Sequence, residues 1–176
     1  MLLNTAPLLR SASGRVGLLA LLLAGAVILT ALAFEHLGGY SPCPLCLQQR
    51  YSYYAAIPAL LLALGLLSAG RKGAASALFA LVALVFIANA GLGAYHAGAE
   101  WKFWPGPDTC GGSQPLSQGA GGLFKDLANT RVIRCDEAAG RFFGLSFAGW
   151  NVIASILLAV GAAYAGVKAW RRQGSG

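Results

Sequence analysis

Charged side chains are scarce in this sequence. Only 11% of its 176 residues are Asp, Glu, Lys or Arg, whereas a typical soluble domain has about 25%. The chain therefore lacks the polar groups needed to cover a water-exposed surface, and 57% of it is hydrophobic, with a mean hydropathy of +0.62. This composition excludes an ordinary soluble protein and predicts a membrane protein.

Acidic residues are scarcer than basic ones, six against thirteen, which gives a net charge of +7. A nucleic-acid-binding module would gather its basic residues on one face, with aromatic residues between them. Here they stand in short groups beside apolar runs, so we assign them to membrane topology and predict no nucleic-acid partner. The chain also lacks an internal repeat and the length for two domains of usual size. We therefore expect a single transmembrane domain over residues 1–176.

Four apolar runs approach the roughly 20 residues that a helix needs to cross a bilayer. The expected spans are residues 16–37, 51–69, 74–95 and 145–167. They predict an all-α integral membrane protein, an antiparallel four-helix transmembrane bundle in contact with the lipid bilayer. The first run also fits a cleaved secretory signal, because Ala31, Leu32 and Ala33 satisfy the small-x-small rule. Its apolar stretch is longer than a usual signal core, which favours a retained span.

Polar features within and between the spans carry further expectations. Pro58 is expected to bend the second helix. Asn89 and Asn151 are expected to hydrogen-bond between helices rather than to carry chemistry. The hydrophilic stretches 38–50 and 96–143 are expected to form loops on one side of the membrane. The longer loop should contain a short amphipathic helix with Leu123, Phe124 and Leu127 on one face.

The distribution of basic residues predicts the orientation. With four spans, both termini and the second turn share one side, which holds seven basic residues and no acidic ones: Arg10, Arg15, Arg71, Lys72, Lys168, Arg171 and Arg172. Basic residues beside spans favour the cytoplasmic side. The termini should therefore be cytoplasmic, and all four cysteines should be periplasmic in the inner membrane of a bacterium. Disulfides form and persist in that compartment.

The four cysteines are Cys43, Cys46, Cys110 and Cys135. Their spacing is not the paired CxxC pattern of a zinc ribbon, so no metal site is expected. Three pairings are possible, and the local one, Cys43 with Cys46 and Cys110 with Cys135, is the natural resting arrangement. Two cysteine pairs on one membrane face can also pass a disulfide between them by thiolate attack.

This layout suggests a redox relay across the membrane surface. The loop pair is accessible to a soluble dithiol protein, whereas Cys46 adjoins the second span and is accessible to a lipid-soluble oxidant such as a quinone. Arg50 lies four residues beyond Cys46, on the same helix face, where its charge would stabilise a Cys46 thiolate. An arginine at this position also fits a snorkelling interface residue.

Three segments resemble the bacterial DsbB family of inner-membrane disulfide-forming proteins. The segment from Pro42 to Arg50 is similar to that family's C-P-L-C-x-x-Q-R signature. The segment from Tyr95 to Cys110 resembles the start of the long periplasmic loop in one branch of the family, and that from Leu145 to Asn151 resembles the entry to its fourth helix. The resemblance covers nearly the whole chain.

The resemblance implies a thiol:quinone oxidoreductase. Such an enzyme reoxidises a periplasmic DsbA-like protein of thioredoxin fold and passes the electrons to a membrane quinone, ubiquinone or menaquinone. By position, Cys110 would form the mixed disulfide with that partner, and Cys135 would be its intramolecular mate and exchange with Cys43. Cys46 would pass electrons to a quinone bound beside Arg50 and His96.

Two other functions are also consistent with the sequence. A bundle that works like vitamin K epoxide reductase would also couple thiols to a quinone, but such sequences usually carry a further span and a differently placed loop pair. A disulfide-stapled membrane scaffold would perform no turnover. In a scaffold, Cys43 and Cys46 could become serine without loss of function.

Overall fold

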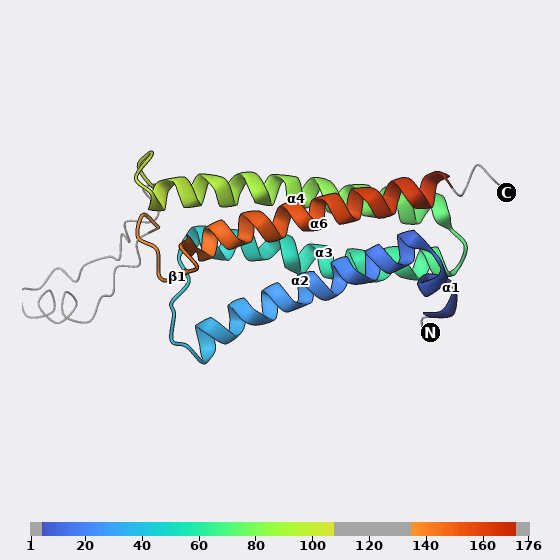
Figure 1. The fold of residues 1–176 in the computed structure, drawn as a ribbon, viewed down its shortest axis with the longest axis horizontal. Coiled ribbons are helices and arrows are strands. Elements are labelled where there is room, and N and C mark those ends of the chain that lie inside the picture. Colours follow the sequence, from blue (N-terminus) through green and yellow to red (C-terminus); the bar gives the residue numbers. More distant parts are fainter. Residues whose placement is uncertain (1–4, 108–134, 172–176) are drawn as a thin grey trace, which may run out of the picture.

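The computed structural model describes residues 5–107 and 135–171. Its elements in chain order are α1 (Thr5–Arg10), α2 (Ala12–His36), α3 (Pro44–Ser68), α4 (Lys72–Glu100), β1 (Arg141–Phe142), β2 (Leu145–Ser146) and α6 (Phe147–Arg171). The four helices of 25 to 29 residues are long and apolar enough to cross a membrane, and they run side by side (Figure 1). The all-α membrane bundle expected from the sequence is confirmed.

The helix α3 begins earlier than the apolar run predicted. It starts at Pro44, within the stretch expected to be a loop, because the Cys43 side chain accepts a hydrogen bond from the backbone N–H of Cys46 and so caps the helix. Proline suits the first helical position, where its missing N–H has no helical partner to lose. The helix then continues through Pro58. As a result, both Cys46 and Arg50 lie on a helix.

The helix α4 ends later than predicted, at Glu100 instead of residue 95, and so carries His96 on its last turns. A tight contact follows its end. A methyl group added at Gly98 would lie 2.0 Å from the Trp104 ring, and the Trp104 indole N–H donates to the Tyr95 carbonyl at 2.9 Å. Glycine therefore lets the chain fold back over the helix end. Cys110 and the helix expected around residues 123–127 lie outside the described residues.

The core runs along the bundle axis between the four long helices. Its largest fully buried side chains include Phe79, Phe86, Leu60, Leu64 and Leu158. Many large apolar side chains face outward instead, among them Leu19, Leu22, Leu29, Leu81 and Leu84. An apolar outer surface is what a lipid environment requires of a helical bundle.

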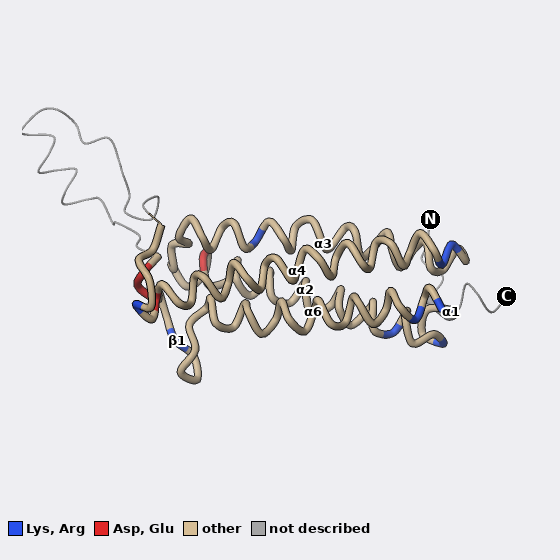
Figure 2. Tube along the Cα trace, turned by 90° about the horizontal axis from the view of Figure 1, so that it is seen from above, with Lys and Arg blue, Asp and Glu red and all other residues tan. Residues whose placement is uncertain are grey.

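Most charge gathers at the two ends of the bundle, apart from a basic segment of α3 and an acidic one that lie farther in (Figure 2). The end that carries α1 and the last turn of α6 has basic residues and, within the described ranges, no acidic ones. These basic residues are Arg10, Arg15, Arg71, Lys72, Lys168 and Arg171. The opposite end, where α3 begins and α4 ends, carries charges of both signs and Cys43, Cys46 and Cys135. This opposite end is called the cysteine end.

Candidate functional site

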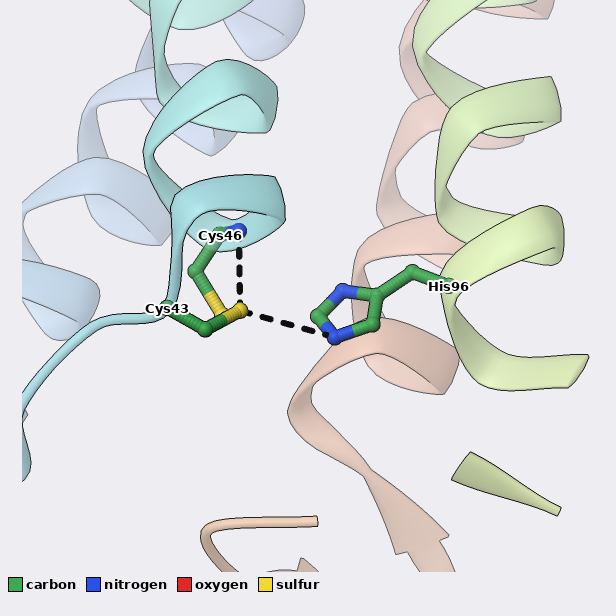
Figure 3. A group of neighbouring side chains, drawn as sticks. All are labelled: Cys43, Cys46 and His96. Carbon is green, nitrogen blue, oxygen red and sulfur yellow. Dashed lines mark hydrogen bonds between the residues drawn. The ribbon is translucent and has the colours of Figure 1, made fainter. Parts of the chain in front are cut away.

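The Cys43–Cys46 pair stands at the first turn of α3 (Figure 3). Both residues are free thiols, and their sulfurs lie 2.8 Å apart. The Cys43 sulfur also accepts the N–H of Cys46 at 3.2 Å. A sulfur at a helix N-terminus faces the positive end of the helix dipole, which favours a thiolate.

The imidazole of His96 reaches across from α4 to this pair (Figure 3). Its Nε2 lies 3.6 Å from the Cys43 sulfur. The hydrogen bond shared with the Cys46 thiol, followed by the contact with His96, lowers the pKa of Cys43 to about 4 despite its burial. Cys43 is therefore a thiolate at neutral pH, which is the reactive form in disulfide exchange.

A chain of hydrogen bonds holds His96 in place. The Gln49 amide N–H donates to His96 Nδ1 at 2.9 Å, and the Asn151 amide N–H donates to Gln49 Oε1 at 2.7 Å. The Tyr53 hydroxyl donates to Asn151 Oδ1, also at 2.7 Å, and Asn89 donates to Ser155 at 3.0 Å. Asn89 and Asn151 thus make hydrogen bonds between helices, as the sequence predicted. The chain joins α3, α4 and α6 and fixes the orientation of the imidazole ring.

A cavity of about 450 Å³ opens beside Cys46, between α2, α3 and α6. Most of its lining is apolar, including Phe34, Ile153 and Leu157, and Cys46 and His96 contribute to its wall. Figure 1 shows α2 diverging from the other helices toward this end. The cavity is large enough for a flat, mostly apolar molecule, and Cys46 rather than Cys43 faces it.

The side chain of Arg50 lies on the wall of the same cavity. Its guanidinium forms an ion pair with Glu35 at the end of α2. The side chains are only 13% and 26% exposed, respectively. The predicted cation therefore lies at the cavity, but a carboxylate from a neighbouring helix holds it.

Cys135 packs in the same buried cluster as Cys43. It is fully buried in a small cluster with Cys43 and Leu45, against which Cys46 and Leu92 pack. It is disulfide-bonded. The structure therefore brings a cysteine of the long loop against Cys43, the position from which the two pairs could exchange. Cys110 lies outside the described residues.

A metal ion is a second possible ligand for this group. The sulfurs of Cys43 and Cys46 and a ring nitrogen of His96 lie within 4.8 Å of one another. Zinc–sulfur bonds of about 2.3 Å in a tetrahedron would place the two sulfurs about 3.8 Å apart, and here they are 2.8 Å apart. The arrangement as it stands suits thiol–disulfide chemistry better than metal binding.

Fold and site together define a class: a four-helix membrane protein with a reactive dithiol between an apolar cavity and a loop cysteine. The model of the family described as "Disulfide bond formation protein DsbB" matches residues 13–165. The chain belongs to the DsbB family, and its role is in disulfide bond formation.

Curated relatives agree with this assignment. The chain is 30% identical over 136 residues to a disulfide bond formation protein B of Aromatoleum aromaticum, covering 73% of this chain and 77% of that protein. It is 32% identical over 158 residues to the protein of that name in Acidovorax sp., covering 81% and 82%. It is 31% identical over 140 residues to that of Xanthomonas euvesicatoria, covering 76% and 78%. No solved structure shows a significant match.

Sequence reasoning assigned no role to several residues that the site contains. Gln49 stood inside the signature and Glu100 inside the loop-entry motif, yet neither was assigned a function. The one available signal was spacing, because residues 96 and 100 are four apart and share a face if the helix continues. Glu35 gave no such signal, since its partner Arg50 is on another helix. Tyr53 stands in a group of tyrosines whose spacing is typical of an interfacial aromatic belt, but it is buried and donates to Asn151.

Proposed function

We propose that this protein is a membrane thiol:quinone oxidoreductase. It would reoxidise a periplasmic DsbA-like dithiol protein of thioredoxin fold and pass the electrons to ubiquinone or menaquinone. The observation that carries the proposal is that the two thiols have different surroundings. Cys46 lines the apolar cavity, whereas Cys43 packs against Cys135 of the loop. Electrons can therefore enter at one sulfur and leave at the other.

Entry begins at the loop disulfide. A thiolate of the reduced partner attacks Cys110 and releases Cys135 as a thiolate, and Cys135 then attacks Cys43 of the Cys43–Cys46 disulfide and releases Cys46. Closure of the partner's own disulfide frees Cys110, which re-forms the loop disulfide with Cys135 and leaves Cys43 reduced. Each step exchanges one S–S bond for another, and the net result is two electrons moved to the Cys43–Cys46 pair.

Exit takes place at the cavity. A quinone there supplies the capacity to accept two electrons and two protons. Cys46 presents its sulfur at the cavity wall, and the Cys43 thiolate, 2.8 Å away, closes the new disulfide with it. Arg50 and His96 line the same wall and would bind the polar headgroup. The cavity volume falls within the range of about 300 to 1,000 Å³ that is usual for small-molecule sites.

The charges at the two ends of the bundle support one orientation in the membrane. The purely basic end is proposed to face the cytoplasm of a bacterial cell, and the cysteine end the periplasm. The thiols are then in the compartment where disulfides persist, and the cavity opens within the membrane, where quinones dissolve.

The direct test is an anaerobic assay of the purified protein with a reduced thioredoxin-fold dithiol protein and ubiquinone. Quinone absorbance should fall with wild-type protein, and Cys46→Ser should abolish the loss. Unchanged quinone reduction by Cys46→Ser would refute the proposal. A disulfide-stapled scaffold would show no quinone reduction even with wild-type protein.

The order of exchange has its own test. Cys135→Ala should accumulate a mixed disulfide between the partner protein and Cys110, because Cys135 is the thiolate released from the loop pair. Non-reducing gels and mass spectrometry identify the linked peptide. Linkage through Cys43 would reverse the proposed order.

A further inference from the structure

Glu100 is a buried carboxylate next to the thiol pair. It lies one turn beyond His96 on α4, and its side chain is only 4% exposed. Its Oε1 is 3.7 Å from His96 Nε2, and its Oε2 has no hydrogen-bond partner within the described part of the chain. A buried carboxylate oxygen without a partner is costly as an anion, so this group has a reason to take up a proton.

A small pocket connects Glu100 with the sulfurs. Its volume is about 30 Å³, and its lining includes Cys43, Cys46, His96, Glu100 and Glu137. One water molecule needs roughly 10 to 15 Å³ of such space and two to four polar neighbours. The pocket can therefore hold a water molecule that bridges the Cys43 thiol and the Glu100 carboxylate.

His96 is not placed to accept the Cys43 proton. Its Nδ1 accepts the N–H of Gln49, which leaves Nε2 as the ring nitrogen that carries a proton. That nitrogen faces both Cys43 and Glu100. The ring is consequently a hydrogen-bond donor toward the sulfur, and its basic nitrogen points away from it.

We propose that Glu100 is the proton acceptor for the Cys43 thiol. The S–H bond of Cys43 breaks, the proton passes through the pocket water, and an O–H bond forms on the Glu100 carboxylate. The products are a thiolate and a carboxylic acid, and no electrons move in this step. The transfer needs only the reduced Cys43–Cys46 pair, but its role in turnover rests on the proposed function.

The charges around Glu100 are compatible with this exchange. His96 on α4 and the sulfurs of Cys43 and Cys46 face it. Glu137 shares the pocket. Burial and the negative charge of the Cys43 thiolate favour a protonated Glu100, whereas a hydrogen bond with Ser146 and the charge of Arg141 on β1 favour the carboxylate to which the proton is transferred. The low pKa of the Cys43 thiol agrees with a proton that has left the sulfur.

Redox-difference infrared spectroscopy tests this without quinone. Full-length protein in lipid nanodiscs is compared with the Cys43–Cys46 pair reduced and oxidised. The reduced form should show the C=O stretch of a protonated carboxylic acid, which Glu100→Gln should remove. The matched control is Glu137→Gln, which should retain the band. A band that persists in Glu100→Gln, or that disappears in Glu137→Gln, would overturn the assignment.

A kinetic comparison separates proton transfer from a structural role. Glu100→Gln should reduce the rate of quinone reduction about tenfold or more, as expected for loss of a general base. The rate of Cys43 alkylation at neutral pH should stay at the wild-type value, because a thiol with a pKa of about 4 is a thiolate at equilibrium whichever group took its proton, and Glu100 affects only how fast the proton leaves during turnover. An unchanged quinone rate would overturn the proposal, as would an equal fall of both rates. If wild-type protein reduces no quinone, the proposed function fails and the infrared test still decides the role of Glu100.

Discussion

At the scale of single residues, hydrogen bonds to the Cys43 sulfur favour its thiolate more than the charge of Arg50, the cation that the sequence predicted beside the thiols. Cys43 caps α3, shares a hydrogen bond with Cys46 and faces His96. Arg50 is held by Glu35 at the cavity. The most reactive thiolate is therefore expected at Cys43, the sulfur that packs against the loop cysteine.

The pH dependence of Cys43 alkylation tests this assignment. Because the folded protein lowers the pKa of Cys43 to about 4, the alkylation rate should be nearly constant from about pH 5.5 to about pH 8. The rate of an ordinary thiol with a pKa near 8.5 would rise about 200-fold over this interval. The rate should fall only when the pH approaches 4 and the thiolate becomes protonated. Mass spectrometry of the modified Cys43 peptide in reduced protein gives the rate.

The variant Cys46→Ala serves as the comparison, because it removes the hydrogen bond that contributes most to the lowered pKa. The titration of Cys43 should then move to higher pH, and Cys46→Ser, which keeps a donor, should move it less. A wild-type rate that rises about tenfold per pH unit across the same interval would show an ordinary thiol.

At the scale of helices, a buried hydrogen-bond chain determines how the site is assembled. It runs from Tyr53 through Asn151 and Gln49 to His96 and links α3, α4 and α6. Cysteine reactivity is therefore coupled to the packing of three helices.

The variant Gln49→Leu should weaken both the bundle and the site. It leaves His96 Nδ1 and the Asn151 amide without the partner they have now, at a cost of about 1 to 3 kcal/mol in the free energy of unfolding. The pKa of Cys43 should rise, because His96 is no longer held toward the sulfur. Thermal unfolding and the alkylation profile measure the two effects.

The adjacent variant Gln48→Leu is the matched control, since Gln48 is exposed on the same helix. It should leave the unfolding temperature and the Cys43 profile at wild-type values. Equal effects of the two substitutions would mean that the hydrogen-bond chain does not position His96.

The sequence predicted the helices and the thiol pair but not the contacts between helices that assemble the site. Apolar runs and charge gaps are local signals, so four helices could be found from them. The early start of α3 depends on the cap formed by Cys43. The Arg50–Glu35 pair and the Gln49–His96 contact depend on which helix faces meet, and no single apolar run contains that information. His96 could be assigned because a resemblance implied it.

At the scale of the whole molecule, the divergence of α2 separates two environments. Cys46 lines the cavity between α2, α3 and α6, whereas Cys43 lies in the buried cluster with Cys135. The fold thus gives the two thiols of one pair different surroundings, which the proposed function uses for electron entry at Cys43 and electron exit at Cys46.

Filling the cavity should block electron exit from Cys46 and leave the reactivity of Cys43 intact. Ala154 lines the cavity, so Ala154→Phe should raise the KM for quinone about tenfold or more, or abolish quinone reduction, because the ring occupies the volume the headgroup needs. Alkylation of Cys43 should be unchanged. The control is Leu84→Phe on the outer surface, which should keep wild-type kinetics. Equal inhibition by both variants would place the quinone elsewhere.

The central claim is that electrons leave the Cys43–Cys46 dithiol for a quinone. A single-turnover experiment tests it most directly: reduced, quinone-free protein in nanodiscs is mixed anaerobically with one equivalent of ubiquinone, without any partner protein. Absorbance reports quinol, and mass spectrometry reports the cysteine pairing. We predict one quinol for each new Cys43–Cys46 disulfide. Thiols that stay reduced, or a disulfide formed without quinol, would contradict the claim.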